Sequence, residues 1–199
     1  MNKLPDHFYR RQDVTGVAQA LLGKKLCTLI GEEYTAAIIV ETEAYSGIAD
    51  RASHSYGGRR TARTETMYRS GGVAYVYLCY GIHYLLNVIS GREGDPTGVL
   101  IRAVEPVEGI EVMLRRRKME RPGPRLSAGP GLVTQALGIG KAQNGVSLQE
   151  GQVWIENTGI SVSAADIVTT TRIGVDYAGD DALLPYRFYI RGNPYVSKK

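Results

Sequence analysis

Apolar positions along the 199-residue chain fall into short blocks that glycine or charged residues separate. Between residues 14 and 22 they recur every three or four positions, which predicts a helix capped by Asp13 or Thr15 and ended by Gly23. The apolar runs 24–30 and 34–45 predict two strands that form a hairpin. Residues 46–72 are polar, basic and rich in glycine, so we expect a functional loop there, with one helical turn near residues 64–68.

The rest of the chain continues the pattern of short strands and short helices. Residues 73–90 predict a second hairpin that turns at Tyr80 and Gly81. Helices are expected over 107–120 and 132–139, and strands over 98–106, 151–157, 167–175 and 185–192. We therefore predict an α+β fold: one domain over residues 1–199, with a mostly antiparallel β-sheet, flanking short helices and a protruding β-hairpin.

The strand 34–45 begins apolar and ends in acid. Strict alternation places Ile39, Glu41, Glu43 and Tyr45 on one face and the even-numbered residues 38 to 44 on the face toward the core. A carboxylate at such a strand end is either half-desolvated, as a general base requires, or fully solvated and idle. For a lone glutamate the idle state is the commoner one. The tyrosine on the same face and the polar loop that follows, which contains a histidine, favour the functional interpretation.

Arg102 interrupts an apolar run that should be buried, and arginine is rarely buried without a partner. Its natural partner is a carboxylate on a neighbouring strand, such as Glu43. The pair could be structural, or it could hold a water molecule between the two groups. Asn87 lies within another apolar run and predicts a buried amide whose partners are backbone groups or a ligand.

The tip of the second hairpin carries an exposed aromatic candidate. Tyr75, Tyr77 and Cys79 should face one way, whereas Tyr80 sits at the turn, where its own chain offers little to pack against. Tyr80 could enter a stack of bases as a wedge, or it could cap the edge of the sheet.

The amino-acid composition is basic and rich in tyrosine. The net charge is +4, and arginines gather in 59–69 and 115–125, which suits a polyanion such as nucleic acid but also occurs on solvated surfaces. The chain has 13 Tyr against two Phe and one Trp, and tyrosine can stack on bases. We expect Cys27 and Cys79 to fill the core as thiols.

The sequence predicts no metal and no cofactor. The three histidines (His7, His54 and His83) show no paired ligand spacing, and glycine-rich phosphate loops are absent. The chain shows neither an apolar signal segment nor a run of 18 apolar residues, so we expect a soluble, cytoplasmic protein without membrane contact.

Two rival functions fit parts of the pattern. A carbohydrate-directed glycosidase needs two carboxyl groups about 5–9.5 Å apart, and Glu41 with Glu43 meets that spacing on paper. The basic loops and the single Trp argue against it. A non-catalytic nucleic-acid-binding domain could use the same sheet and arginines.

Six motifs carry a resemblance to a known family: "VETEAY" with "HSYGG", "YVYLCYGIHYLLNV", "GVLIRAVEP", "SAGPG", "RIGV" and "RFYIRGNPYVS". In this order, over about residues 14–197, they resemble the alkyladenine (3-methyladenine) DNA glycosylase family. The resemblance implies an enzyme that flips damaged purines out of double-stranded DNA, such as 3-methyladenine, 7-methylguanine, hypoxanthine or ethenoadenine. It implies hydrolysis of the N-glycosidic bond, which leaves an abasic site. We expect a monomer, nucleoid-associated if the source is bacterial.

The resemblance also assigns roles to single residues. In catalysis, Glu43 matches the general base, Arg102 the residue that helps hold the attacking water, and Ile173 a backbone carbonyl that contacts this water. The residues matched to the base pocket are Tyr45, His54 and Tyr77, which sandwich the flipped base, and Asn87, which disfavours guanine. The residues matched to DNA contacts are Tyr80, which fills the gap in the helix, together with Ile82, His83, Arg59 and Arg63.

One position departs from the family pattern. The loop "SGPxKL" of the family carries a lysine where this chain has Leu132. The resemblance implies that this lysine contacts a phosphate, so Leu132 should weaken the hold on the DNA backbone unless Arg125 or the helix N-terminus compensates. Glu41 is expected to serve structure or the orientation of its neighbours. Because the chain has no lysine near these motifs to act as an amine nucleophile, we expect a monofunctional hydrolase that does not cut the strand.

Overall fold

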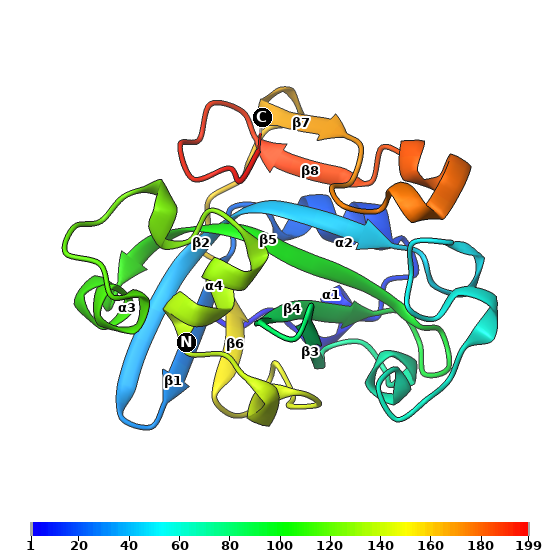
Figure 1. Cartoon of the computed structure of the whole chain (residues 1–199), viewed down its shortest axis with the longest axis horizontal. Coiled ribbons are helices and arrows are strands. Elements are labelled where there is room, and N and C mark those ends of the chain that lie inside the picture. Colours follow the sequence, from blue (N-terminus) through cyan, green and yellow to red (C-terminus); the bar gives the residue numbers. More distant parts are fainter. Residues whose placement is uncertain (1, 199) are drawn as a thin grey trace.

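The computed structural model describes residues 2–198, and its ribbon is a curled β-sheet with short helices on both faces (Figure 1). The strands are β1 (Lys25–Ile30), β2 (Glu33–Tyr45), β3 (Ala74–Cys79), β4 (His83–Ser90), β5 (Thr97–Glu108), β6 (Val153–Glu156), β7 (Ile167–Thr170) and β8 (Arg187–Ile190). The α-helices are α1 (Asp6–Tyr9), α2 (Val14–Leu21), α3 (Ile110–Arg117) and α4 (Pro130–Leu137). Short 3₁₀ segments include η3 (Glu65–Tyr68) and η7 (Asp176–Leu183).

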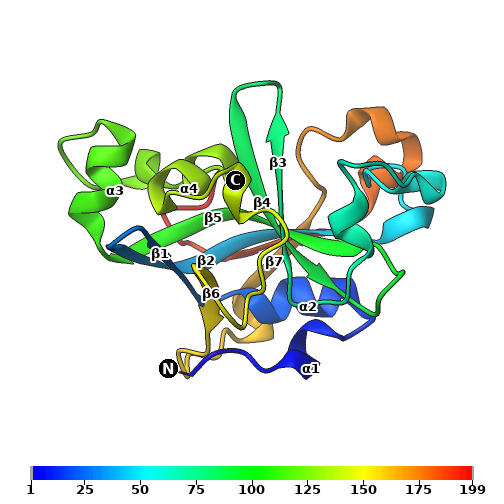
Figure 2. The same ribbon diagram turned by 90° about the horizontal axis from the view of Figure 1, so that it is seen from below.

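The described strands form one sheet in the order β3-β4-β5-β2-β1-β6, with β8 pairing to both β2 and β7. Each of these pairings is antiparallel. Helix α2 covers one face, and α3 and α4 cover the other (Figure 2). The predicted α+β class with a mostly antiparallel sheet is confirmed, and so are both hairpins and the three strands of the C-terminal part. Within residues 2–198, no helix combines the length and apolar character of a membrane span.

Helix α2 forms where the apolar spacing predicts it. The side chain of Asp13 accepts a hydrogen bond from the backbone N–H of Gly16 at 2.8 Å, which caps the first turn. Gly23 follows the helix at φ +79°, a conformation that glycine adopts without strain. The apolar face of α2 enters the main core, and Thr42 of β2 donates a hydrogen bond to the carbonyl of Ala18 at 2.9 Å. Helix α2 therefore holds the C-terminal end of β2 in place.

Three register shifts interrupt the pairing of β2 with β5, and they change which residues share a face. Ile39 pairs with Val104 and Glu41 pairs with Ala103, so two steps along β2 match one step along β5. Neighbouring residues of β5 point to opposite faces, and their partners Ile39 and Glu41 do the same. The prediction that Ile39 shares the glutamate face is therefore wrong. Ile39 is buried in the main core, while Ile38, expected there, is only half-buried.

The hairpin of β3 and β4 stands out from the body of the molecule (Figure 2). Three residues, 80–82, separate the paired Cys79 and His83, and the N–H of Ile82 donates to the carbonyl of Cys79 at 3.1 Å. Within this turn Tyr80 and Gly81 have φ values of +50° and +70°. The hairpin tip is therefore a fixed turn that presents its side chains away from the core, as the sequence predicts.

The basic cluster on α3 is engaged by the protein itself. Arg115 and Arg116 both pair with Glu33, and Arg116 also donates to the carbonyl of Ala136 at the end of α4. Arg117 donates to the carbonyl of Leu126 at 3.2 Å. These contacts join α3 to the sheet and to α4, so these arginines have partners within the protein, although the side chain of Arg115 remains 62% exposed.

Candidate active site

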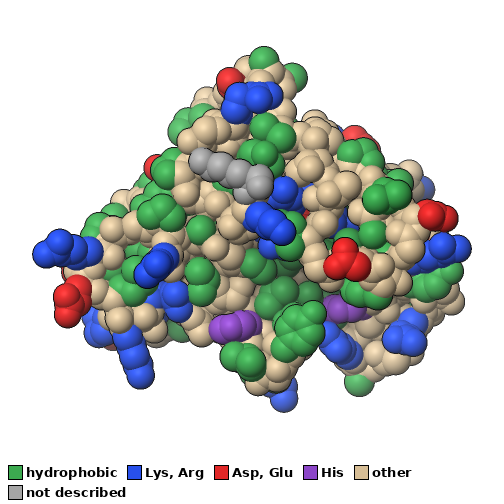
Figure 3. All heavy atoms as spheres, turned by 45° about the horizontal axis from the view of Figure 1, so that its top comes forward, with side chains coloured by type: hydrophobic (Ala, Val, Ile, Leu, Met, Phe, Trp, Pro, Cys, Tyr) green, Lys and Arg blue, Asp and Glu red, His purple; other side chains and the backbone are tan. Residues whose placement is uncertain are grey.

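A cavity of about 590 Å³ opens between the hairpin tip, the start of α4 and residues 173–177. In the space-filling view a recess lined by hydrophobic side chains is bordered by histidine and by basic residues (Figure 3). A smaller cavity of about 40 Å³ lies beside it, lined by Asn87 and Met67 among others. Four side chains line both cavities: Tyr45, His54, Tyr77 and Tyr177. The site therefore has an open mouth and a small inner chamber that share these rings.

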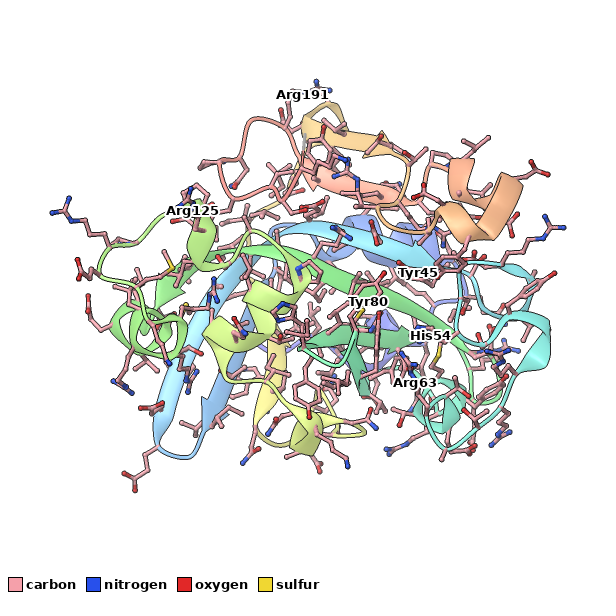
Figure 4. The ribbon with its side chains drawn as sticks, viewed as in Figure 1. Tyr45, His54, Arg63, Tyr80, Arg125 and Arg191 are labelled. Atoms are coloured by element: carbon pink, nitrogen blue, oxygen red, sulfur yellow. The ribbon has the colours of Figure 1, made fainter. Side chains whose placement is uncertain are left out.

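The predicted ring residues come together from three separate segments. Tyr45 ends β2, His54 lies in the polar loop and Tyr77 belongs to β3. The rings of His54 and Tyr77 meet edge to face, with centroids 4.5 Å apart. Tyr45 and His54 lie close together on the same side of the molecule, with Tyr80 and Arg63 beside them (Figure 4). The sequence predicted this grouping only through the family resemblance.

His54 is held as a neutral ring. Its Nδ1 lies 3.0 Å from the hydroxyl of Tyr75, which fixes the orientation of the imidazole. Burial lowers the pKa of His54 to about 4, and the positive charges of Arg63 and Arg59 act in the same direction. At neutral pH the ring can therefore stack on a purine without adding a positive charge to the pocket.

Glu43 is fully buried at the edge of this pocket and is contacted from three sides. Its Oε1 accepts a hydrogen bond from the backbone N–H of Ile173 at 2.8 Å and lies 3.2 Å from Nη1 of Arg102. Its Oε2 accepts a hydrogen bond from the hydroxyl of Tyr45 at 2.9 Å. Burial raises the pKa of Glu43 above its usual 4.5, although Arg102, the Ile173 N–H and the Tyr45 hydroxyl all oppose this rise.

The contacts of Glu43 leave one acceptor position open. A carboxylate has about four lone-pair sites, two on each oxygen. The Ile173 N–H and Arg102 engage Oε1, whereas Oε2 has one partner, the Tyr45 hydroxyl. Oε2 is therefore the less engaged of the two oxygens, although Glu43 itself lines neither cavity. The sequence had suggested a water between Glu43 and Arg102, and the structure instead brings the two groups into direct ionic contact.

Asn87 lies at the wall of the small cavity, largely buried. Its Nδ2 donates to the backbone carbonyl of Tyr75 at 3.4 Å, which is a long hydrogen bond. The predicted buried amide is therefore present, and it faces the same chamber as Met67 and Ile89.

Three of the five predicted DNA contacts line the large cavity, namely Arg63, Tyr80 and His83. At the hairpin tip Tyr80 is 89% exposed and Ile82 is 71% exposed. His83 is half-buried, and a Cβ at Gly131 would come within 2.8 Å of its ring, so glycine is needed at the start of α4. The guanidinium of Arg63 lies 5.1 Å from the centroid of Tyr77 and lines the cavity. Arg59 is exposed but does not line it.

Three further residues of the mouth differ from expectation. Cys79 is only half-buried and lines the large cavity, so the prediction that it fills the core is wrong; Cys27 is buried as predicted. Leu132 also lines the cavity, at the position where the family has lysine. Tyr177, which sequence reasoning missed, is 71% exposed and lines both cavities. Its hydroxyl donates to the carbonyl of Ala52 at 3.0 Å, which holds the ring at the mouth.

A buried ion pair that the sequence did not reveal packs against the ring of Tyr45. Asp50 and Arg172 form two contacts of 2.5 and 2.9 Å, and both side chains are fully buried. The Arg172 guanidinium lies 4.9 Å from the centroid of Tyr45 and donates to the carbonyl of Ala44. The only sequence signal was the position of Arg172 next to Ile173, inside the "RIGV" motif.

Among residues 2–198, His, Cys, Asp and Glu side chains form no group of three or more that could hold a metal ion. Two carboxylates near the pocket are each paired with an arginine. Glu43 is paired with Arg102, and Asp50 with Arg172. The chemistry that this arrangement offers is acid–base chemistry by a buried carboxylate beside a ring-lined pocket.

Comparison with known proteins points to one family. The family model described as "Methylpurine-DNA glycosylase (MPG)" matches residues 7–194. A protein of Desulfitobacterium hafniense (strain Y51) is 43% identical over 208 residues, which covers 100% of both chains. Proteins of Bacillus thuringiensis (strain Al Hakam) and Bacillus cereus (strain ATCC 14579) are 46% and 47% identical, each covering 98% of both chains. All three are named "Putative 3-methyladenine DNA glycosylase". The chain belongs to the methylpurine-DNA glycosylase family.

Proposed function

We propose that this protein removes damaged purines from double-stranded DNA by hydrolysing the N-glycosidic bond, with Glu43 as the general base for the attacking water. Family membership supports the coarser statement that it is a DNA glycosylase. The observation that carries the finer one is the environment of Glu43: a buried carboxylate with an open acceptor position on Oε2, next to the rings that line both cavities.

The chemistry needs little beyond this carboxylate. Alkylation at a ring nitrogen makes a purine cationic and therefore a good leaving group. The flipped base would lie against Tyr45, His54 and Tyr77, whose faces contribute about 0.5–2 kcal/mol for each contact with a cation. Flipping itself costs a few kcal/mol, and less for a damaged or mispaired base, which adds selectivity. What remains is to place and deprotonate one water molecule.

Arg102 and Ile173 keep Glu43 ready for this task. The cation and the backbone N–H both stabilise the ionised carboxylate, which is the form that accepts a proton. Tyr80 would fill the gap that the flipped nucleotide leaves, because it is the most exposed large side chain at the hairpin tip. Ile82, His83, Arg59 and Arg63 would contact the surrounding DNA.

Base release from a panel of duplexes tests the proposal. Each duplex carries one lesion: hypoxanthine, ethenoadenine, 3-methyladenine or 7-methylguanine. We expect free base and an abasic site that is cut only after alkaline treatment, because neither cavity is lined by a lysine that could act as an amine nucleophile within residues 2–198. Absence of release from all four duplexes would reject the proposal, and strand scission by the pure protein would reject the monofunctional mechanism.

The rate of base release should fall in acid at a pH above the ordinary pKa of glutamate. The base must be ionised, and burial raises the pKa of Glu43 above 4.5, so activity is lost as the pH falls through that raised value. The variant Tyr45→Phe keeps the ring but removes a hydroxyl that lowers this pKa, so its acid limb should lie at a still higher pH. Single-turnover rates between pH 4 and 8 measure the acid limb of the wild type and that of Tyr45→Phe. A rate that stays level down to pH 4.5 would argue against Glu43 as the base.

Restoring the family's lysine should strengthen the hold on the DNA backbone. Leu132 lines the cavity near the start of α4, so Leu132→Lys places one cation at its mouth. One added phosphate contact steepens the dependence of log K on log salt by about 0.9. Fluorescence anisotropy with a lesion duplex at several salt concentrations measures this slope. An unchanged slope would mean that position 132 does not reach a phosphate.

A further inference from the structure

We infer that Glu41 and the C-terminal segment 193–198 position the Arg102–Glu43 pair, so that the end of the chain takes part in setting the catalytic geometry. This inference rests on the proposed function of Glu43. It concerns the motif "RFYIRGNPYVS", which no step of the proposed reaction uses, and Glu41, a fully buried acid two residues before the base.

Glu41 receives contacts from the tail, from β8 and from β5. Its Oε2 accepts a hydrogen bond from the backbone N–H of Ser197 at 2.7 Å. Its Oε1 accepts one from Nη1 of Arg187 at 2.8 Å and lies 3.3 Å from Nε of Arg102. The next ionic contact along this path joins Arg102 to Glu43 at 3.2 Å. A continuous path of charged contacts therefore leads from the tail to the proposed base.

Arg187 connects this path to the other side of the pocket. Its Nη1 also donates to the carbonyl of Lys198 at 2.8 Å, which gives the tail a second anchor. Its Nε donates to the carbonyl of Thr171 at 3.0 Å, two residues before Ile173, whose N–H contacts Glu43. One buried guanidinium thus joins the tail to Glu41 and to the segment that contains Ile173.

The position of Arg102 depends on this arrangement. Both ionic contacts of Arg102 are with carboxylates, and its buried Nε makes an ion pair with Glu41 without a hydrogen bond, so the guanidinium is held by charge rather than by fixed hydrogen-bond geometry. A buried carboxylate stays in place only if donors and cations compensate it. Removing the Ser197 N–H leaves Oε2 of Glu41 without its donor. Glu41 can then turn, and Arg102 follows it away from Glu43.

The contact uses only the backbone of Ser197, which gives a matched pair of variants. Ser197→Pro removes the N–H, whereas Ser197→Ala keeps it. The hydroxyl of Ser197 is buried and makes no hydrogen bond within the described part of the chain, so its loss in Ser197→Ala should matter little. Glu41→Gln keeps the shape of the buried side chain but removes its charge, and it serves as a second test if Ser197→Pro does not fold.

The experiment compares single-turnover release of hypoxanthine by the wild type and these variants, with fold and thermal stability checked by circular dichroism. We expect Ser197→Ala to stay within about twofold of the wild type, and Ser197→Pro to lose about tenfold in rate with duplex affinity unchanged. Because Arg102 lowers the pKa of Glu43, its displacement should also move the acid limb of the rate profile to higher pH. If segment 193–198 had a purely structural role, the acid limb of a folded variant would not move.

The outcomes separate this inference from the proposed function. If the wild type releases no base, the proposed function fails and this inference fails with it. If the wild type is active and folded Ser197→Pro matches Ser197→Ala in rate and acid limb, only the inference is overturned. A rate loss that follows the unfolded fraction alone, with the acid limb unchanged, would overturn it too. If Ser197→Pro cannot be folded, Glu41→Gln decides by the same two measurements.

Discussion

Replacing Glu43 with Gln should lower the single-turnover rate of hypoxanthine release by about 10³-fold, because a positioned general base contributes about 10²–10⁴-fold. The amide has nearly the same shape as the carboxylate, but it cannot accept the proton of the attacking water. Glu43 is fully buried and does not line the open cavity, so affinity for the lesion duplex should be retained. Quench assays with enzyme in excess measure the rate, and fluorescence anisotropy measures the affinity.

Glu33 provides a matched control on the same strand. It stands at the start of β2, paired with Arg115 and Arg116 on the outside of the molecule, so Glu33→Gln removes a charge without touching the pocket. Its rate should stay close to that of the wild type. A Glu43→Gln enzyme that still releases base at the rate of the control would remove Glu43 from the mechanism. A wild type that binds the duplex but never releases base would instead support the alternative of a non-catalytic nucleic-acid-binding domain.

The variant Tyr80→Ala should lose about 10- to 100-fold in base release from duplex DNA and much less from single-stranded DNA. Tyr80 is 89% exposed at a rigid hairpin tip, so it gains contact area only when it enters the helix. Stacking on a base is worth about 1–3 kcal/mol by alanine substitution, which sets the size of the loss. A single strand needs no wedge because its bases are not paired. The ratio of the two rates therefore isolates the contribution of the wedge.

Ile160→Ala is a suitable control because Ile160 is also an exposed apolar residue and does not line the cavity with the ring residues. It should leave both rates unchanged. Equal losses on duplex and single strand in Tyr80→Ala would show that Tyr80 supports the pocket rather than the flipped state.

Much of the fold follows from local sequence signals. The helix α2, with its cap at Asp13 and its end at Gly23, lies where apolar spacing and end signals place it. The β3–β4 hairpin turns at Tyr80 and Gly81 because this pair can adopt positive φ between two apolar strands. Such features depend on residues close together in the chain, which is why the sequence predicts them.

Other features depend on contacts between distant segments and were not predictable in this way. A bulge is set by the pairing of β2 with β5, so a strict alternation put Ile39 on the wrong face. The arginines of α3 looked free because their partners Glu33 and the carbonyl of Ala136 lie elsewhere in the chain.

The pocket itself needs segments from across the chain. Its ring residues were predicted from the family resemblance, and the structure brings them together. The pair of Asp50 and Arg172 behind Tyr45 became visible only in the fold, since 122 positions separate the two residues. The same holds for the contact between Ser197 and Glu41. Charged residues that support a site from behind carry no periodic pattern that sequence reasoning could use.

A crystal structure of the Glu43→Gln variant bound to a duplex that contains ethenoadenine would test the central claim most directly. We predict the lesion flipped against Tyr45, His54 and Tyr77, with an ordered water within hydrogen-bond reach of the residue 43 side chain. The base bound elsewhere, or the residue 43 side chain sealed from water with the lesion in place, would contradict the account.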